Sequence, residues 1–242
     1  SAGIETHCGL LESSAEALNP GFCQRMRTGR PYVRSKLAMS LDGRTAMASG
    51  ESQWITGPDA RRDVHRLRAR SSAIITGVGT VLADNPTLTA RLGDQADIVQ
   101  PVRIVLDSQL RLPTGLKLAE EPGVIVLTTL PESRWHKLPG VTIHQLPSDG
   151  HSRLDLSAVI RWLGEQQFNE VMFEAGPTLN GALLRENLVD EWTIYMAPVV
   201  LGDSGRGLFH LPELQNMADR HALKLADVRR VGQDIRMIFS GG

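Results

Sequence analysis

Short apolar runs rich in β-branched residues alternate, from about residue 31 onward, with segments whose apolar residues recur at helical spacing. The runs have the length and content of buried strands. This alternation predicts an α/β fold built on a central sheet. The expected strands cover residues 32–39, 72–77, 102–107, 124–128, 141–146, 171–174, 192–196, 223–231 and 235–239.

Helices are expected in several intervals between these strands. Pro58 suits the first turn of a helix, where its missing N–H is not needed. The core-facing stripe of this helix would consist of Ala60, Val64 and Leu67. An adjoining face carries Arg61, His65 and Arg68. Further helices are expected at residues 10–18, 156–166 and 178–187.

The last two expected strands have no helix between them. Residues 232–234 read as a turn, so the two strands predict an antiparallel hairpin at the edge of a mainly parallel sheet. No internal repeat or interdomain linker follows residue 31. One domain is therefore expected, preceded by a short helix and a connector in residues 1–30.

Composition excludes several classes of protein. The 242 residues are 41% hydrophobic, which is enough for a full core. Lys and Arg total 26 against 27 Asp and Glu, so no overall field would draw the chain to nucleic acid or to an anionic membrane. Its apolar runs are shorter than a bilayer span and no signal-peptide pattern opens it, so a cytoplasmic location is expected.

Several catalytic and metal-binding patterns are missing from the sequence. Cys8 and Cys23 form no CxxC pair and are expected to be reduced thiols. The seven histidines show neither HxH nor HExxH spacing, so no metal site is expected. The absence of a GxSxG elbow and a GxxxxGK[ST] loop argues against a lipase-like hydrolase and a P-loop kinase.

The most informative stretch is VMFEAGPTLNGALL, at residues 171–184, where Glu174 ends a strand and Gly176 opens a turn into a helix. A glycine lets the backbone approach a ligand, and the free N–H groups at a helix start can bind an anion. The stretch indicates a cofactor-phosphate site, although a plain strand-to-helix connection fits the same pattern. Ser108 ends another strand at a position typical of a cofactor ribose or its phosphate.

A second candidate ligand loop follows the expected strand 72–77. Gly77 and Gly79 permit an unusual turn there, and residues 84–86 form a second bend. Ligands of open α/β sheets gather beyond the carboxyl ends of the strands. The expected wall residues are Thr80, Asp84, Leu88 and Arg91. In the alternative interpretation Asp84 only caps backbone N–H groups of the turn.

Three further segments contribute candidates. Lys36 and Ala38 share one face of the first strand because side chains alternate along a strand. Ser52 and Trp54 lie in a Gly-rich loop, where an indole can lie against a flat ring, although a buried core anchor is the commoner role of a tryptophan. Arg68 is the arginine of its helix that we expect to bind phosphate, while the others are solvated.

Five blocks of the sequence together resemble the reductase family of riboflavin biosynthesis, the C-terminal half of bifunctional bacterial RibD. They are KLAMSLDGRTA (36–46), SQWITG (52–57), ITGVGTVLADNPTLTAR (75–91), PVRIVLDSQLRLP (101–113) and VMFEAGPTLNGALL (171–184). The resemblance implies a dihydrofolate-reductase-like α/β fold for residues 31–242, with residues 1–30 as the remnant of a deaminase domain and its connector. The zinc deaminase signature, HxE with PCxxC, is absent, so no deaminase activity is expected.

The resemblance also implies an activity. This is the NADPH-dependent reduction of 5-amino-6-(5-phosphoribosylamino)uracil to 5-amino-6-(5-phosphoribitylamino)uracil, in which hydride passes to ribose C1′. It further implies a covalently fused N-terminal zinc deaminase domain in the intact parent and a homodimer. Two alternatives stay open: a pterin or folate reductase of the same fold, and a non-catalytic nucleotide-binding module.

Matching positions in the five blocks imply the roles of individual residues. The candidates for proton transfer are Glu174 and Asp84. The substrate is expected to contact Lys36, Ser52, Arg68, Leu88, Arg91 and Glu174, with its phosphate on Arg68 and Arg91. NADPH is expected to contact Ala38, Trp54, Thr80, Asp84, Ser108, Gly176, Pro177, Thr178, Leu179, Asn180, Gly181 and Ala182.

Overall fold

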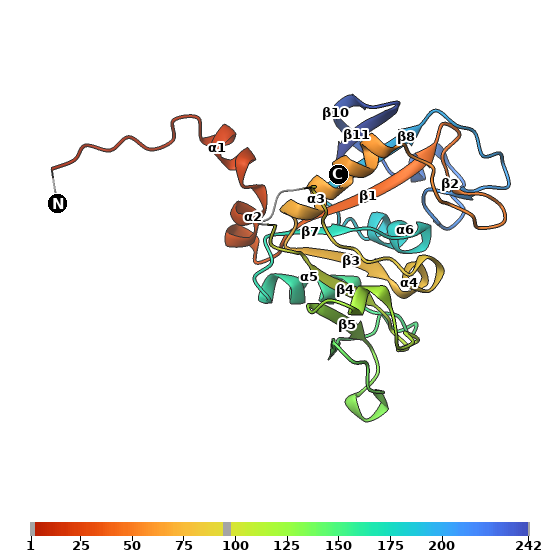
Figure 1. The fold of residues 1–242 in the computed structure, drawn as a ribbon. Coiled ribbons are helices and arrows are strands. Elements are labelled where there is room, and N and C mark those ends of the chain that lie inside the picture. The colour runs from red at the N-terminus through yellow and green to blue at the C-terminus, as the bar shows by residue number, and fades with distance from the viewer. Residues whose placement is uncertain (1–2, 94–97, 242) are drawn as a thin grey trace.

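A nine-stranded sheet runs through the computed structural model, which describes residues 3–93 and 98–241 (Figure 1). In spatial order the strands are β10 (Lys224–Val231), β11 (Asp234–Ser240), β8 (Glu191–Ala197), β1 (Tyr32–Ser40), β7 (Glu170–Phe173), β3 (Ala73–Gly77), β4 (Val102–Leu106), β5 (Val124–Thr128) and β6 (Val141–Gln145). The strands from β8 to β6 are parallel, whereas β11 pairs antiparallel with both β8 and β10. This confirms the predicted α/β fold, a mainly parallel sheet with an antiparallel C-terminal hairpin.

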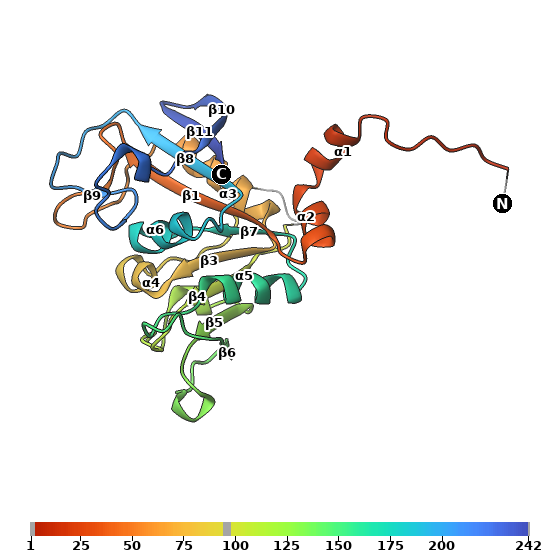
Figure 2. The ribbon, with the colours of Figure 1, turned by 180° about the vertical axis from the view of Figure 1, so that it is seen from behind.

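Helices cover both faces of this sheet (Figures 1 and 2). Helices α3 (Pro58–Arg70) and α4 (Val78–Asp84) lie on one face, and α5 (Leu156–Glu165) and α6 (Pro177–Arg185) lie on the other. The alternation of side chains along β3 shows why: Ile74 belongs to the core cluster under α3, and Ile75 belongs to the cluster under α5 and α6. Both core layers therefore fix the central strands relative to the helices.

Smaller elements complete the chain. Helices α1 (Glu12–Leu18) and α2 (Pro20–Thr28) precede the sheet, and Arg25 of α2 donates a hydrogen bond to Asn169 at 2.7 Å. Strands β2 (Arg44–Ala46) and β9 (Arg206–Gly207) form a separate two-stranded sheet. The 3-10 helices are η1 (Lys117–Ala119), η2 (Glu132–Arg134) and η3 (Met217–Asp219). Among the described residues, none of the helices is both long and apolar enough to cross a bilayer.

Two local expectations were wrong. The turn expected at Gly77 and Gly79 is the start of helix α4, because Val78 and Val81 recur at helical spacing and are buried in one core cluster. The connector expected before residue 31 contains the additional helix α2, which begins at Pro20. The second bend is present, since Asn85 ends α4 with a positive φ of 39°. Strands β2 and β9 are too short to leave a periodic pattern in the sequence.

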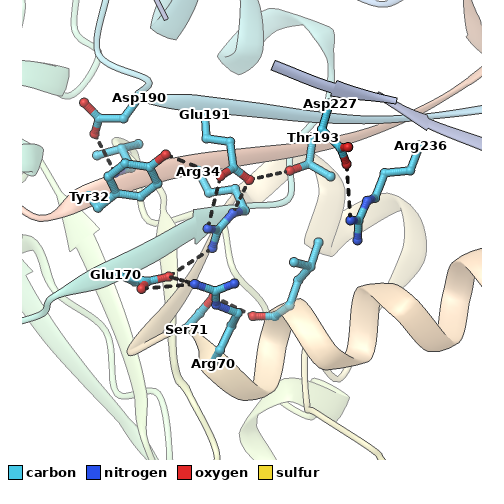
Figure 3. A network of polar contacts seen from close by, with 12 residues as sticks. Tyr32, Arg34, Arg70, Ser71, Glu170, Asp190, Glu191, Thr193, Asp227 and Arg236 are labelled. Carbon is cyan, nitrogen blue, oxygen red and sulfur yellow. Dashed lines mark hydrogen bonds and ion pairs between the residues drawn. The ribbon is translucent and has the colours of Figure 1, made fainter. Parts of the chain in front are cut away.

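A buried polar network joins the amino ends of β1, β7 and β8 (Figure 3). Arg34 is 2% exposed, and it donates to Glu191 at 2.6 Å and to Glu170 at 3.2 Å. Thr193 also donates to Glu191, at 2.8 Å. Burial opposes the charge of Glu191, but the hydrogen bond and charge of Arg34 hold its pKa below the usual range. These bonds satisfy a buried guanidinium and fix the three central strands in register.

The C-terminal hairpin is tied to helix α3 by polar contacts. Asp234 is 2% exposed and accepts the N–H of Gly57, the residue before α3, at 2.8 Å. Further along α3, Asp63 accepts hydrogen bonds from Tyr195 of β8 and Arg236 of β11, each at 2.7 Å. The hairpin therefore fixes the start and the first turns of α3, the helix that carries several candidate site residues.

Candidate active site

A cleft of about 1310 Å³ lies beyond the carboxyl ends of β1, β3, β4 and β7. Its lining contains the expected site residues, with Gly181 as the exception. Nine lysines and arginines line the cleft against four aspartates and glutamates, although the whole chain carries a net charge of −1. A positive cleft on a nearly neutral protein favours ligands that carry negative charge.

Arg68 of α3 and Glu174, which follows β7, form a paired unit in the cleft. The Nε and Nη2 atoms of Arg68 donate to the two carboxylate oxygens of Glu174 at 2.6 and 2.8 Å, and Nη1 donates to the carbonyl of Thr89 at 3.0 Å. Burial opposes the charge of Glu174, but Arg68, assisted by Lys36, lowers its pKa to about 2. Glu174 is therefore a carboxylate at neutral pH and can accept hydrogen bonds.

Lys36 of β1 lines the cleft next to this pair. Burial lowers the pKa of Lys36, the negative charge of Glu174 opposes that shift, and the positive charge of Arg68 adds to it. In the described part of the chain its ammonium group forms no hydrogen bond or ion pair, and it lies 6.0 Å from the centre of the Tyr195 ring. Lys36 is thus available to a ligand, and its lowered pKa makes it a better proton donor near neutral pH.

Arg91 and His65 form the wall of the cleft on the side of α3. The backbone N–H of Arg91 donates to Nδ1 of His65 at 3.2 Å, so this nitrogen carries no proton. Burial and the charges of Arg68 and Arg91 lower the pKa of His65. The side chain of Arg91 is exposed and makes no ion pair among the described residues. Leu88, 2% exposed, packs beneath this wall in the core cluster of α3.

Trp54 stands at the rim of the cleft and is 70% exposed, so it is not a core anchor. The Arg61 guanidinium lies over the indole at 4.8 Å from the ring centre. Arg61 also donates to the carbonyl of Thr56 at 2.7 Å, which fixes its position. One face of the indole therefore lies against the Arg61 guanidinium. Ser52, in the same loop, also lines the cleft.

The N-terminus of α6 contributes small residues to the cleft. Asn180 is fully buried: its Oδ1 accepts from Ser35 at 2.7 Å, and its Nδ2 donates to the carbonyl of Ala175 at 2.8 Å. It therefore joins β1 to the turn before α6. Gly181 points away from the cleft, where an added Cβ would lie 2.1 Å from the carbonyl oxygen of His210. Close packing explains the glycine at this position.

The remaining expected residues lie on the β3 and β4 side. Thr80 and Asp84 come from helix α4, and Asp84 is exposed at its last turn. Ser108 lines the cleft just after β4, and its Oγ accepts the N–H of Leu154 at 3.0 Å. The cleft thus brings together Arg91, Lys36, the α6 N-terminus and Ser108.

The sequence profile of the RibD C-terminal domain matches residues 31–237. The chain belongs to this family. RibD of Escherichia coli is 47% identical over 99% of the chain and 68% of its own length. A solved structure of Acinetobacter baumannii RibD, form 1, gives a TM-score of 0.89 at 42% identity, covering 100% of this chain and 66% of that chain. The chain thus spans about two thirds of the length of these RibD relatives.

One relative consists almost entirely of the domain that matches this chain, and its name gives the activity of that domain. The Saccharomyces cerevisiae riboflavin biosynthesis reductase Rib7 matches with a TM-score of 0.72 at 25% identity, over 96% of the chain and 99% of Rib7. The RibD C-terminal domain is therefore the reductase domain. This confirms the expected family and enzyme class, an oxidoreductase of riboflavin biosynthesis.

Several cleft residues of this RibD domain were not singled out from the sequence. Arg61 and His65 were recognised only as neighbours of Arg68 on one helix face, a spacing that could have marked all three. Arg111 and Arg153 also line the cleft. They lie in polar loops, where an arginine is usually solvated, so no sequence signal separates them from surface residues.

Proposed function

We propose that the chain reduces 5-amino-6-(5-phosphoribosylamino)uracil to 5-amino-6-(5-phosphoribitylamino)uracil with NADPH. The observation that carries this proposal is the Lys36, Arg68 and Glu174 group, which lies between an exposed arginine and a helix N-terminus in one cleft. Arg91 suits the sugar phosphate at one side. The N–H groups of the first turn of α6 suit the cofactor diphosphate at the other.

The donors along the cleft fit an extended dinucleotide. The exposed face of Trp54 suits a flat ring, the small residues at the α6 N-terminus let backbone approach a diphosphate, and Ser108 has a hydroxyl proton left to donate. Ala38 and Thr80 would complete this side of the cleft. Bound NADPH would supply the hydride, and the protein would align it with the sugar.

Lys36 and Glu174 suit the ring opening that must precede hydride transfer. The C1′–O4′ bond of the ribose breaks as the nitrogen lone pair forms an iminium ion with C1′, and the ammonium group of Lys36 delivers a proton to O4′. Bound NADPH would then supply the hydride that forms a new C–H bond at C1′, while the C=N π electrons return to the nitrogen as a lone pair. Glu174, held as a carboxylate by Arg68, stabilises the positive iminium and can accept a hydrogen bond from a sugar hydroxyl.

The exposed Asp84 has a lesser place in this scheme. It lies exposed on the last turn of α4, lines the cleft and, within the described part of the chain, forms no hydrogen bond or ion pair with Lys36 or Glu174. We therefore propose that it contacts the cofactor and that proton transfer depends on Lys36 and Glu174.

We propose the same partners that the family resemblance implies. These are an N-terminal zinc deaminase domain fused to this domain in the parent protein, and a second copy in a cytoplasmic homodimer. Edge strand β10 supports the dimer, because Leu225 and Val228 expose 53% and 51% of their surface there. Analytical ultracentrifugation that found only a 26.5 kDa species would refute the dimer.

The decisive experiment is NADPH oxidation by the purified chain, followed by ultraviolet absorbance. The substrate is freshly deaminated phosphoribosylamino-pyrimidine, and dihydrofolate is the control. We expect turnover of the first substrate alone. Turnover of dihydrofolate alone would establish a folate reductase instead, and cofactor binding without turnover of either would indicate a nucleotide-binding module.

A further inference from the structure

The cleft loop at residues 87–91, which carries Leu88 and Arg91, is attached to the rest of the protein by side chains. Within residues 3–93 and 98–241, no backbone-to-backbone hydrogen bond reaches this loop. Thr89 and Ala90 are nevertheless 9% and 2% exposed. Buried backbone N–H and C=O groups need partners, so side chains must supply them here. The shape of the loop therefore depends on a few particular side chains.

Gln100 supplies two of these partners. Its Nε2 donates to the carbonyl of Ala90 at 2.9 Å, and its Oε1 accepts the N–H of the same residue at 2.9 Å. The side-chain amide thus pairs with Ala90 as a residue on a neighbouring strand would, using one donor and one acceptor. Without this amide, two buried backbone groups would lose their partners.

Gln100 is itself firmly attached to the central sheet. The next residue, Pro101, is buried and restricts the backbone of Gln100 to extended conformations. The N–H of Val102, at the start of β4, then donates to the carbonyl of Ser72 at 3.1 Å. Gln100 does not line the cleft. It can therefore affect a ligand only through the loop that it holds.

Helix α3 holds the two residues that flank Ala90. The Nη1 atom of Arg68 donates to the carbonyl of Thr89 at 3.0 Å, and the N–H of Arg91 donates to Nδ1 of His65 at 3.2 Å. Burial and the charges of Arg68 and Arg91 lower the pKa of His65, which favours the neutral ring that this acceptor requires. Three consecutive residues of the loop are thus held from two sides.

The side chain of Arg91 has no such attachment of its own. It lines the cleft, is exposed, and forms no hydrogen bond or ion pair in the described part of the chain. The position of its guanidinium therefore depends on where the backbone of residues 89–91 is held. A loop fixed before the ligand arrives does not have to be ordered on binding, and this favours affinity.

We infer that Gln100 is a positioning residue for the substrate phosphate. By pairing with Ala90 from outside the cleft, it keeps the adjacent Arg91 where the sugar phosphate binds. The inference rests on the proposed function, because it takes Arg91 as the residue that binds this phosphate.

The test begins with Gln100→Met, which keeps the length of the side chain and removes both hydrogen bonds. We expect KM for the phosphoribosylamino substrate to rise about five-fold to ten-fold, with kcat and the Kd of NADPH within about two-fold. The matched control is Gln145→Met. Gln145 is an exposed glutamine of β6 outside the cleft that also donates to a backbone carbonyl, that of Thr129, at 3.3 Å. Its replacement should change none of these constants.

A double-mutant cycle shows whether Gln100 acts through Arg91. In an Arg91→Ala background, Gln100→Met should change KM by less than about two-fold, because the group that it positions is already missing. If the two substitutions instead raise KM by factors that multiply, Gln100 acts independently of Arg91 and the inference is wrong. Equal losses in KM and in NADPH affinity for Gln100→Met would also overturn it.

Amide hydrogen exchange tests the contact without any turnover. The peptide that contains Ala90 and Arg91 should exchange faster in Gln100→Met than in the wild type, and at the wild-type rate in Gln145→Met. Unchanged exchange in Gln100→Met would overturn the inference while the reductase function stands. If the wild type fails to turn over the substrate, the proposed function is wrong, and faster exchange would then show a structural contact alone.

Discussion

The guanidinium of Arg68 and the carboxylate of Glu174 meet through two parallel hydrogen bonds of 2.6 and 2.8 Å. The two side chains are only 14% and 13% exposed. The pairing links two roles that the sequence suggests separately, phosphate binding by Arg68 and proton transfer by Glu174. Three N–H groups of Arg68 already bind Glu174 and Thr89. We therefore propose that Arg68 mainly holds Glu174 ionised and that Arg91 binds the substrate phosphate.

Arg91→Ala should therefore act on substrate binding. We expect KM for the phosphoribosylamino substrate to rise about ten-fold or more, with kcat and the Kd of NADPH within about two-fold, because a charge contact to the ground-state phosphate is lost. Steady-state kinetics and NADPH titration measure both. The control is Arg62→Ala, which removes an exposed arginine of α3 outside the cleft. An equal loss of NADPH affinity would place Arg91 on the cofactor.

Glu174→Gln keeps the shape of the side chain and removes its charge. We expect kcat to fall about 100-fold, because the charge that stabilises the iminium ion is lost. Single-turnover kinetics with saturating NADPH isolates this step. Asp84→Asn is the comparison and should leave kcat within a few fold. An unchanged kcat in Glu174→Gln would limit Glu174 to a structural role.

Acid should remove the stability that ionised Glu174 provides. The pKa of Glu174 is about 2 in the folded chain against 4.5 for an ordinary glutamate, so the unfolded chain takes up the proton first as the pH falls. The stabilisation is complete above about pH 4.5 and is lost as the pH falls toward 2. Urea unfolding across this range should show a weaker pH dependence for Glu174→Gln. Identical slopes for the two proteins would contradict the pairing.

Lys36 should set the alkaline limit of activity. Its pKa is lowered by burial, so kcat should fall as the pH rises through a value below the ordinary lysine value of 10.5, where the donor loses its proton. Lys36→Met should lower kcat about 100-fold and abolish the decrease of kcat at alkaline pH. If kcat still falls at alkaline pH in Lys36→Met, another group is responsible for this pH dependence.

Asp234→Ala should weaken the start of α3 without touching the cleft. The N–H of Gly57 loses its acceptor, and we expect the free energy of unfolding to fall by about 1 kcal/mol, as for the loss of a helix cap. Urea denaturation measures the change. Asp203→Ala, which removes a fully exposed carboxylate, should have no effect. If both variants unfold alike, the contact between the hairpin and α3 contributes nothing to stability.

Much of the sheet could be predicted because its apolar runs and turns are local patterns. The same holds for Lys36 and Ala38, which reach the cleft by simple alternation along β1. Helix α4 was missed because two glycines favour a turn, whereas the burial of Val78 and Val81 stabilises a helix. Tertiary packing outweighed the local preference.

Contacts between distant segments could not be predicted from the sequence. Nothing in the sequence marks the partner of Arg68 as Glu174, or indicates that Arg34 is buried in a strand between two glutamates. Such charges are stable only because the folded chain brings their partners together. Arg111 and Arg153 are a similar case. They line the cleft, but no spacing in the sequence distinguishes them from surface arginines.

The central position of β1 has a consequence for how the chain folds. Its parallel partners come from far along the sequence, with Tyr32 opposite Glu170 and Arg34 opposite Glu191, whereas β3, β4, β5 and β6 pair in consecutive order. Closing the long loops to β1 carries the greater entropic cost, so we expect β3 to β6 to pair early and β1 to join late. Lys36 comes to lie near Glu174 only after β1 has joined the sheet. Recovered activity during refolding should therefore report the completion of the whole sheet.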